Sequence, residues 1–481
     1  MNTILAPLRE LGEYEDIQKQ LNIQQGKVSI SGCVDSQKLH MVYGLTEKYD
    51  VKLIVTYSDM KAKELLDDCK LYCRESYYFP AKDLIFYQAD IHSNQLIKER
   101  VAVLRKLLEG EPITIVTTFS ALMAHQLPLS VWQENVIEIE EGGIAEEAAI
   151  ARQLVKMGYE KNYQVEAPGQ FSVRGGIVDI FDLTRENPVR IELWGDEVES
   201  IRSFDIESQR SIEKLTEVSI YPATELILSK KALEDGLARM EKDCKKSAAF
   251  FREETKPEEA HRLEQAVAEL KEQVTQFQSF VNLESYIGYF YEETQSLVDF
   301  VADRKLCICL DESARIEEHA NAVELEFRES MSTRAEKGYI LPEQMNVLYG
   351  AREIYARLDK NRLLALSTME YKGFPVKFQN RYAVNARNVS SYNNSFPELV
   401  KDLNHYKKNG YRVLLVSASS TRAKRLATDL MDEGLNAFYS DNSQRELQPG
   451  EIMTFYGNVL KGFEYPCLLY TSPSPRDRSL S

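Results

Sequence analysis

Helix and strand patterns alternate through the first 125 residues of this chain, and this alternation constrains its fold more than any other feature. Apolar runs typical of buried strands occur at 27–32, 51–58, 76–79 and 112–122, and amphipathic helical patterns separate them. Parallel strands need a long crossover between neighbours, and helices of this length supply it. The pattern therefore predicts an α/β fold built on a parallel sheet.

A block between residues 170 and 204 breaks this alternation. Its strand patterns are short, and turn-forming sequences separate them, namely Gly175-Gly176, Glu186-Asn187-Pro188 and Gly195-Asp196. Strands spaced this closely have no room for a helical crossover. The block therefore predicts an antiparallel meander, and a β-rich module interrupts the α/β chain.

The rest of the chain returns to helical and α/β patterns. Residues 229–281 are helical with a break near Pro257, and we expect their apolar stripe to pack on neighbouring elements and not to form an intermolecular coiled coil. A buried strand pattern follows at 305–313. A helix, a strand and a second helix within 395–434 predict a further, smaller α/β unit.

The loop after the first predicted strand is similar to a phosphate-binding loop. Gly32 and Lys38 hold two positions of the pattern G-x-x-x-x-G-K-[ST] at the right spacing. The second glycine of the pattern lets backbone N–H groups wrap a phosphate, and Gln37 stands in its place. Leu39 stands where the pattern has the hydroxyl residue that binds Mg²⁺. Asp35 adds a negative charge where the phosphate would lie. The sequence therefore argues against nucleotide binding here.

Asp311 and Glu312 favour the opposite interpretation. They follow an apolar strand pattern, and such an acid pair holds Mg²⁺ and orients water in nucleoside triphosphatases. The other interpretation is a capping pair at a strand end. Together with Gly32 and Lys38, the two acids predict a degenerate nucleotide site. The fold of a nucleoside triphosphatase would then be retained without its catalytic activity, and we expect no catalytic residues. The alternative is a working ATPase that uses Lys38, Asp311 and Glu312.

Composition narrows the function classes. The 75 acidic residues outnumber the 59 basic ones, giving a net charge of −16, whereas dedicated nucleic-acid binders are usually basic. The sequence has no apolar run of about 18 residues, so we expect no membrane-spanning helix. Its N-terminus lacks a signal-peptide pattern. Seven cysteines without an export signal indicate reduced thiols, and neither Cys nor His shows metal-ligand spacing. We therefore expect a cytoplasmic protein without a metal site or a membrane partner.

One strand pattern of the β-rich block predicts a surface for a protein partner. Because side chains alternate along a strand, the odd-numbered residues from Val189 to Leu193 face a core, and Arg190 and Trp194 share the polar face. Ser172 and Arg174 of the preceding strand face out in the same way. Exposed tryptophan beside arginine is typical of interface hot spots. The alternative is that Trp194 covers a second layer and the arginines are merely solvated.

Longer motifs carry a family resemblance. They are YFPAKD, IKERVAVLRKL, GQFSVRGGIVDIF, PVRIELWGDEVESIRSFDIESQRS, YPATE, NLESYIGYF, RAEKGYILPEQ and GFEYP. Together they resemble the UvrB-homologous N-terminal part of the bacterial transcription-repair coupling factor, Mfd, over roughly residues 1–466. UvrB itself is similar, but it needs an intact phosphate loop, and Gln37 and Leu39 argue against it.

The resemblance implies a RecA-like parallel sheet domain with a degenerate P-loop, split by an inserted β-rich domain that binds UvrA and followed by a small α/β domain. Carried over by motif, Arg174, Arg190 and Trp194 fall on the UvrA-contacting face. The expected boundaries are 1–125 and 221–375 for the two parts of the RecA-like domain, 126–220 for the insertion and 385–466 for the small domain.

The family also implies lost ATP hydrolysis in this region and recruitment of UvrA in transcription-coupled nucleotide excision repair. Full-length members add an RNA-polymerase-binding module and an ATP-dependent double-stranded-DNA translocase. Because intact translocase motifs are missing from the sequence, we expect no cofactor in this chain. ATP, Mg²⁺, RNA polymerase and DNA are expected only for the full-length parent. We expect residues 467–481 to be a non-native or disordered tail on a truncated copy.

Overall fold

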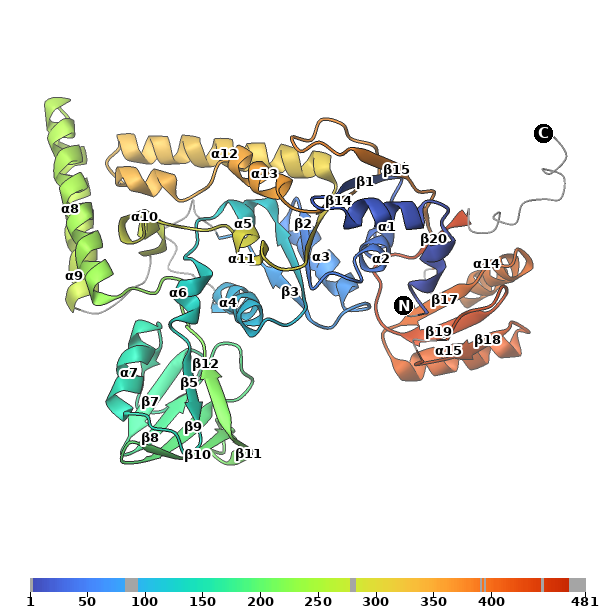
Figure 1. The fold of residues 1–481 in the computed structure, drawn as a ribbon, viewed down its shortest axis with the longest axis horizontal. Helices are drawn as coiled ribbons and strands as arrows, with labels where there is room; N and C mark the ends of the chain where they lie inside the picture. The colour runs from blue at the N-terminus through green and yellow to red at the C-terminus, as the bar shows by residue number, and fades with distance from the viewer. Residues whose placement is uncertain are drawn as a thin grey trace.

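The computed structural model describes residues 3–82, 94–276, 283–389, 392, 395–442 and 445–466 (Figure 1). The predicted tail, 467–481, lies outside the described residues. Figure 1 shows a central α/β body, a β-rich unit below it, a pair of long helices at one end and a smaller α/β unit at the other.

A seven-stranded sheet forms the centre of the body, and all of its strand pairs are parallel. In spatial order its strands are β15 (Asn380–Ala383), β1 (Lys27–Ser31), β14 (Leu363–Leu366), β13 (Leu306–Asp311), β2 (Val51–Thr56), β4 (Ile113–Thr118) and β3 (Ser76–Phe79). The first and last parts of the chain meet in this sheet, because β1 lies between β14 and β15. The expected parallel sheet is confirmed.

Helices cover both faces of the sheet, which explains why its strands read as continuous apolar runs. Along β13, Ile308 packs into one hydrophobic cluster and Cys307 and Cys309 into the other. The second cluster includes residues of α1 (Tyr14–Asn22), α2 (Gln37–Leu45) and α3 (Asp59–Cys69). The first includes residues of α4 (Asn94–Glu109), α5 (Phe119–Met123), α6 (Leu129–Gln133), α11 (Leu297–Val301), α12 (Ser313–Glu336) and α13 (Ala351–Asp359).

The predicted helical region forms an antiparallel pair, α8 (Lys230–Glu253) and α9 (Pro257–Gln276), joined by α10 (Ile287–Phe290) to the body. The described part of its apolar stripe is buried and packs with residues of α8, which confirms packing on a neighbour. Those stripe residues are Leu263, Val267, Leu270 and Val274, while Phe277 and Val281 lie outside the described residues.

The insertion is a six-stranded sheet in the order β11-β10-β9-β8-β7-β6, with every pair from β7 to β11 antiparallel. Gly176 makes the β7–β8 turn possible, because its φ is +85° and a Cβ there would lie 2.9 Å from the Leu193 carbonyl oxygen. The predicted meander is confirmed. The elements of the insertion are β5 (Ile137–Glu140), α7 (Glu147–Lys156), β6 (Glu160–Lys161), β7 (Gln170–Arg174), β8 (Ile177–Ile180), β9 (Val189–Trp194), β10 (Glu197–Phe204), β11 (Ser211–Leu215) and β12 (Glu217–Ile220), of which β5 and β12 pair with each other.

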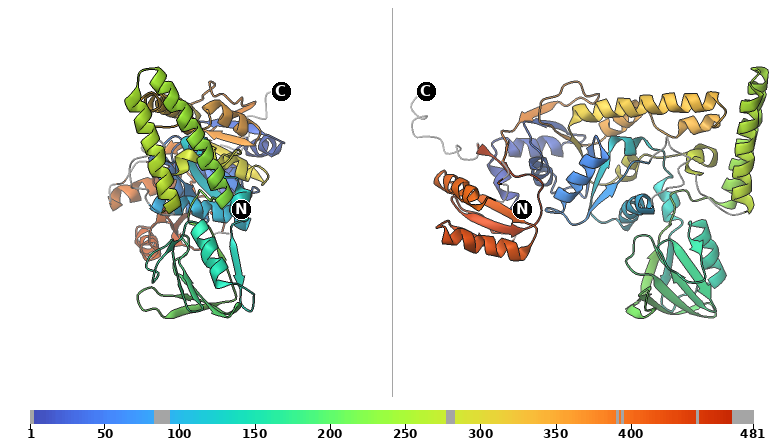
Figure 2. Two further views of the ribbon diagram at one scale, coloured as in Figure 1. Left: turned by 90° about the vertical axis from the view of Figure 1, so that its left-hand side faces the viewer. Right: turned by 180° about the vertical axis from the view of Figure 1, so that it is seen from behind.

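The small α/β unit has a three-stranded parallel sheet in the order β17-β19-β18 and lies at the opposite end of the molecule from α8 and α9 (Figure 2). Its elements are α14 (Phe396–Lys408), β17 (Val413–Ser417), α15 (Ser420–Asp432), β18 (Ala437–Tyr439) and β19 (Ile452–Tyr456). The chain then returns toward the body, where β20 (Phe463–Glu464) pairs with β16 (Arg387–Asn388).

The predicted fold class is confirmed: an α/β protein whose parallel sheet domain is interrupted by a β-rich insertion and followed by a smaller α/β domain. Among the described residues, no helix combines the length and apolarity needed to cross a membrane.

Candidate functional site

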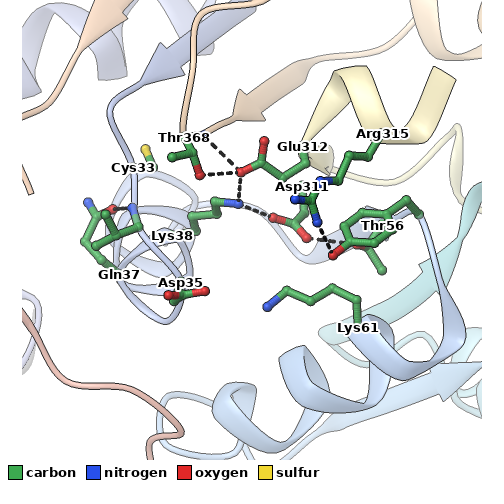
Figure 3. Close-up of polar contacts among 12 residues, drawn as sticks. Cys33, Asp35, Gln37, Lys38, Thr56, Lys61, Asp311, Glu312, Arg315 and Thr368 are labelled. Atoms are coloured by element: carbon green, nitrogen blue, oxygen red, sulfur yellow. Dashed lines mark hydrogen bonds and ion pairs between the residues drawn. The ribbon is translucent and has the colours of Figure 1, made fainter. Parts of the chain in front are cut away.

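The loop between β1 and α2 lies beside the carboxyl end of β13, where nucleotides bind in folds of this kind (Figure 3). Gly32 begins the loop with a φ of +77°, and a Cβ there would lie 2.1 Å from the Val384 carbonyl oxygen. Glycine is therefore required by the backbone at this position, whether or not a phosphate binds.

The structure brings Lys38, Asp311 and Glu312 into direct contact (Figure 3). Lys38 Nζ lies 2.6 Å from Asp311 Oδ1 and 2.6 Å from Glu312 Oε1, and the three side chains are 6%, 5% and 18% exposed. Thr56 Oγ1 donates to Asp311 Oδ2 at 2.8 Å, and Thr368 donates through N and Oγ1 to Glu312 Oε1. The ammonium charge is thus neutralised within the protein.

The local electrostatics favour the charged forms of Lys38 and Glu312. Burial alone would lower the pKa of Lys38, but the carboxylates of Asp311 and Glu312 outweigh burial and raise it. Burial alone would raise the pKa of Glu312, but Lys38 and then Thr368 outweigh it and lower the pKa. Glu312 has a left-handed backbone, with φ of 60°, which costs on the order of 1–3 kcal/mol for a residue with a side chain.

A chain of hydrogen bonds through Gln37, Tyr465 and His40, here called the relay, lies where the pattern has its second glycine. Gln37 is fully buried, and its Nε2 donates to the Tyr465 hydroxyl at 2.9 Å. Because the Ile4 carbonyl can only accept, His40 Nε2 donates to it, and Nδ1 of the neutral ring accepts from Tyr465 at 2.9 Å. Burial lowers the pKa of His40 to about 4, which keeps the ring neutral near pH 7.

The segment that leaves the small domain continues over the same loop. Leu460 N donates to Asp68 Oδ1 at 2.8 Å, and Ser36 Oγ donates to the other carboxylate oxygen of Asp68 at 2.6 Å. Lys461 Nζ lies 3.2 Å from Asp35 Oδ2. The loop between β1 and α2 is therefore packed against the segment 460–465, an arrangement that sequence reasoning missed because these partners are far apart in the chain.

The second site is the outer face of the inserted sheet. Arg190 donates twice to Asp179, from Nε to Oδ1 at 2.7 Å and from Nη2 to Oδ2 at 2.8 Å, and Arg174 Nη2 donates to Oδ2 at 2.9 Å. Trp194 is 79% exposed, so the alternative that it covers a second layer is wrong. The structure thus places the three predicted residues on one face of the sheet and shows that its arginines are ion-paired.

Two features of this face differ from the sequence-based expectation. Ser172 lies on the outer face as predicted, in register with Asp179, but it is fully buried. Asp179, in the same row of the sheet, accepts hydrogen bonds from Arg190 and Arg174. Asp179, which is 1% exposed, was not singled out from the sequence, although an acid inside the apolar run IVDIF was a usable signal.

Within the described ranges, no group of three or more His, Cys, Asp or Glu side chains is placed to hold a metal ion. Of the seven cysteines, the six that are described are free thiols.

Comparison with known proteins first defines the inserted unit. The family model of the UvrB interaction domain matches residues 137–226, which run from the first residue of β5 to beyond β12. The chain therefore carries a UvrB interaction domain inserted in an α/β body with a parallel sheet.

The particular relatives are transcription-repair-coupling factors. The chain is 31% identical to that of Bacillus subtilis over 471 residues, which is 97% of this chain and 39% of the relative. It is 25% identical to those of Staphylococcus epidermidis (strain RP62A), over 92% of this chain and 37% of the relative, and Staphylococcus aureus (strain MRSA252), over 96% and 39%. The similarity to the N-terminal part of the coupling factor, inferred from motifs, is confirmed, and the chain spans about two fifths of these relatives.

Proposed function

We propose that this chain recruits the damage-recognition protein UvrA in transcription-coupled nucleotide excision repair and that UvrA binds the outer face of the inserted sheet. The observation that carries the proposal is the exposure of Trp194 on the same face as Arg174 and Arg190, in a sheet that matches the UvrB interaction domain. Tryptophan and arginine dominate interface hot spots because they combine large contact area with fixed donor geometry.

The relatives extend beyond the matched part, which covers about two fifths of their length. We propose an ATP-dependent translocase on double-stranded DNA that displaces stalled RNA polymerase, with ATP and Mg²⁺ held outside this chain. The net charge of −16 suits a region that docks a protein while other domains track DNA.

The remnant phosphate loop supports a non-catalytic role over the alternative of a UvrB-like ATPase. Lys38, which would neutralise a bound phosphate, is committed to Asp311 and Glu312. Gln37 fills the position of the second glycine and is fully buried. A nucleotide would therefore have to break a buried ion cluster before it gained its own contacts.

Binding of purified UvrA to the full chain tests the proposal. The informative variant is Trp194→Ala, because the side chain is exposed and its loss leaves the domain core intact. Charge reversal of Arg190 is a poor test, because it places a second carboxylate against buried Asp179. A wild-type chain that does not bind UvrA would overturn the proposal. Tight Mg-ATP binding by calorimetry would favour the ATPase.

A further inference from the structure

Asp179 occupies an unusual position for a carboxylate. In β8 it is in register with Ser172 of β7 and Arg190 of β9, and it is 1% exposed. A buried carboxylate is costly unless cations and donors compensate it. Both cations that do so here belong to the proposed UvrA-docking face.

The contacts fix the arginines in defined orientations. Both carboxylate oxygens of Asp179 accept a hydrogen bond from Arg190, as a two-point pair, and one of them accepts a third bond from Arg174. Arg190 also donates from Nη2 to Gln209 Oε1 at 3.0 Å, and its guanidinium lies 4.4 Å from the centre of the Phe204 ring. A guanidinium held by two carboxylate oxygens, an amide and an aromatic ring has few rotamers left.

The clamp leaves donors available for a partner. A guanidinium has five N–H donors, and Arg190 engages only its Nε and Nη2 atoms with acceptors of the described chain. With acceptors of the described residues, Arg174 engages only Nη2, and it is 36% exposed, compared with 18% for Arg190. The free N–H groups fit carboxylate or carbonyl oxygens on a protein surface.

We infer that Asp179 is a positioning residue for UvrA binding, which holds Arg174 and Arg190 in the orientation that the partner recognises. This inference rests on the proposed function. Arginines that are ordered before binding lose less side-chain entropy on association. Asp179 itself makes no contact with the partner, because it is only 1% exposed.

The test compares Asp179→Asn with Ser172→Ala in the full chain by calorimetric titration with UvrA. Asn keeps the shape but loses the charge that holds both guanidinium groups, and we expect about tenfold weaker binding. Ser172 lies in the same buried row, and its Oγ has no partner among the described residues, so Ser172→Ala should bind like the wild type. Equal affinity of Asp179→Asn and the wild type would overturn the inference while the proposed function stands.

Two further measurements separate positioning from a purely structural role. In an Arg174→Ala/Arg190→Ala background, Asp179→Asn should weaken UvrA binding no further, whereas general destabilisation would weaken it again. In the wild-type chain labelled with ¹⁵N-arginine, the Arg190 Nε–H should exchange slowly with solvent, free and bound. Exchange as fast as that of free arginine would refute the clamp even if Asp179→Asn does not fold. A wild-type chain that fails to bind UvrA would overturn the proposed function and this inference together.

Discussion

Replacing Lys38 by methionine tests whether the former phosphate loop is now a structural ion cluster. Methionine keeps the apolar stem but removes the ammonium that contacts Asp311 and Glu312 at 2.6 Å each. Two carboxylates are then left close together, 5% and 18% exposed, with only threonine donors to compensate them. A lysine kept for phosphate binding would be dispensable to the free protein.

The expected loss of stability in Lys38→Met follows from the burial of the Lys38, Asp311 and Glu312 side chains. Removing one member of a buried ion pair typically costs about 3–5 kcal/mol of stability, because the charge that remains is buried without a partner. Thr56 and Thr368 remain as donors to the acids, so we expect the lower end, about 3 kcal/mol in the free energy of unfolding near pH 7.

The pH dependence has a definite sign. Lys38 lowers the pKa of Glu312 below its ordinary value of 4.5, so the wild type gains stability from this pair above that pH and loses it as pH falls through the folded-state pKa. In Lys38→Met the Glu312 carboxylate binds a proton more easily, because the ammonium that lowers its pKa is gone. The difference between variant and wild type should therefore be full at pH 7 and shrink below the ordinary pKa of Glu312.

The two tryptophans make a selective assay possible. Trp132 is buried in the core cluster of the sheet domain, whereas Trp194 is exposed on the insertion. In a Trp194→Phe background, fluorescence during urea unfolding reports the sheet domain alone. Lys70→Met is the matched control, because the Lys70–Asp67 pair is 57% and 53% exposed and is worth at most about 1 kcal/mol. A loss from Lys38→Met no larger than that of Lys70→Met would refute the structural role.

Three further predictions concern other sites. Trp194→Ala should weaken UvrA binding about tenfold or more without changing the urea midpoint, whereas Met369→Ala, equally exposed outside the insertion, should not; equal affinities would remove Trp194 from the interface. Tyr465→Phe should cost about 1–2 kcal/mol, because it breaks the relay over the loop, while Tyr456→Phe, at an exposed position, should be neutral in the same urea assay. His40 should contribute to acid sensitivity: its pKa falls from 6.5 in the unfolded chain to about 4 in the fold, so the unfolded state binds the proton first and stability drops as pH falls. The loss from His40 between pH 7 and pH 5 should be about 2 kcal/mol, and an unchanged slope in His40→Gln would contradict this cause.

Local periodicity made much of the fold predictable. The alternation of helix and strand patterns predicted the parallel sheet, and turn sequences predicted the antiparallel insertion. The period of two along β9 correctly predicted that Val189, Ile191 and Leu193 are buried and that Trp194 is not. Such patterns are reliable because backbone geometry alone determines which side chains share a face.

The sequence by itself thus determined the class of fold, the outward direction of Trp194 and the loss of the second glycine and the hydroxyl from the phosphate loop. Only the tertiary structure decided what replaced them. Tyr465 reaches Gln37 from 428 positions away, and Lys38 reaches Asp311 across 273, because β1 and β13 are separated in the sheet by β14 alone. Strand order and domain packing depend on the whole core, so no local pattern encodes these contacts.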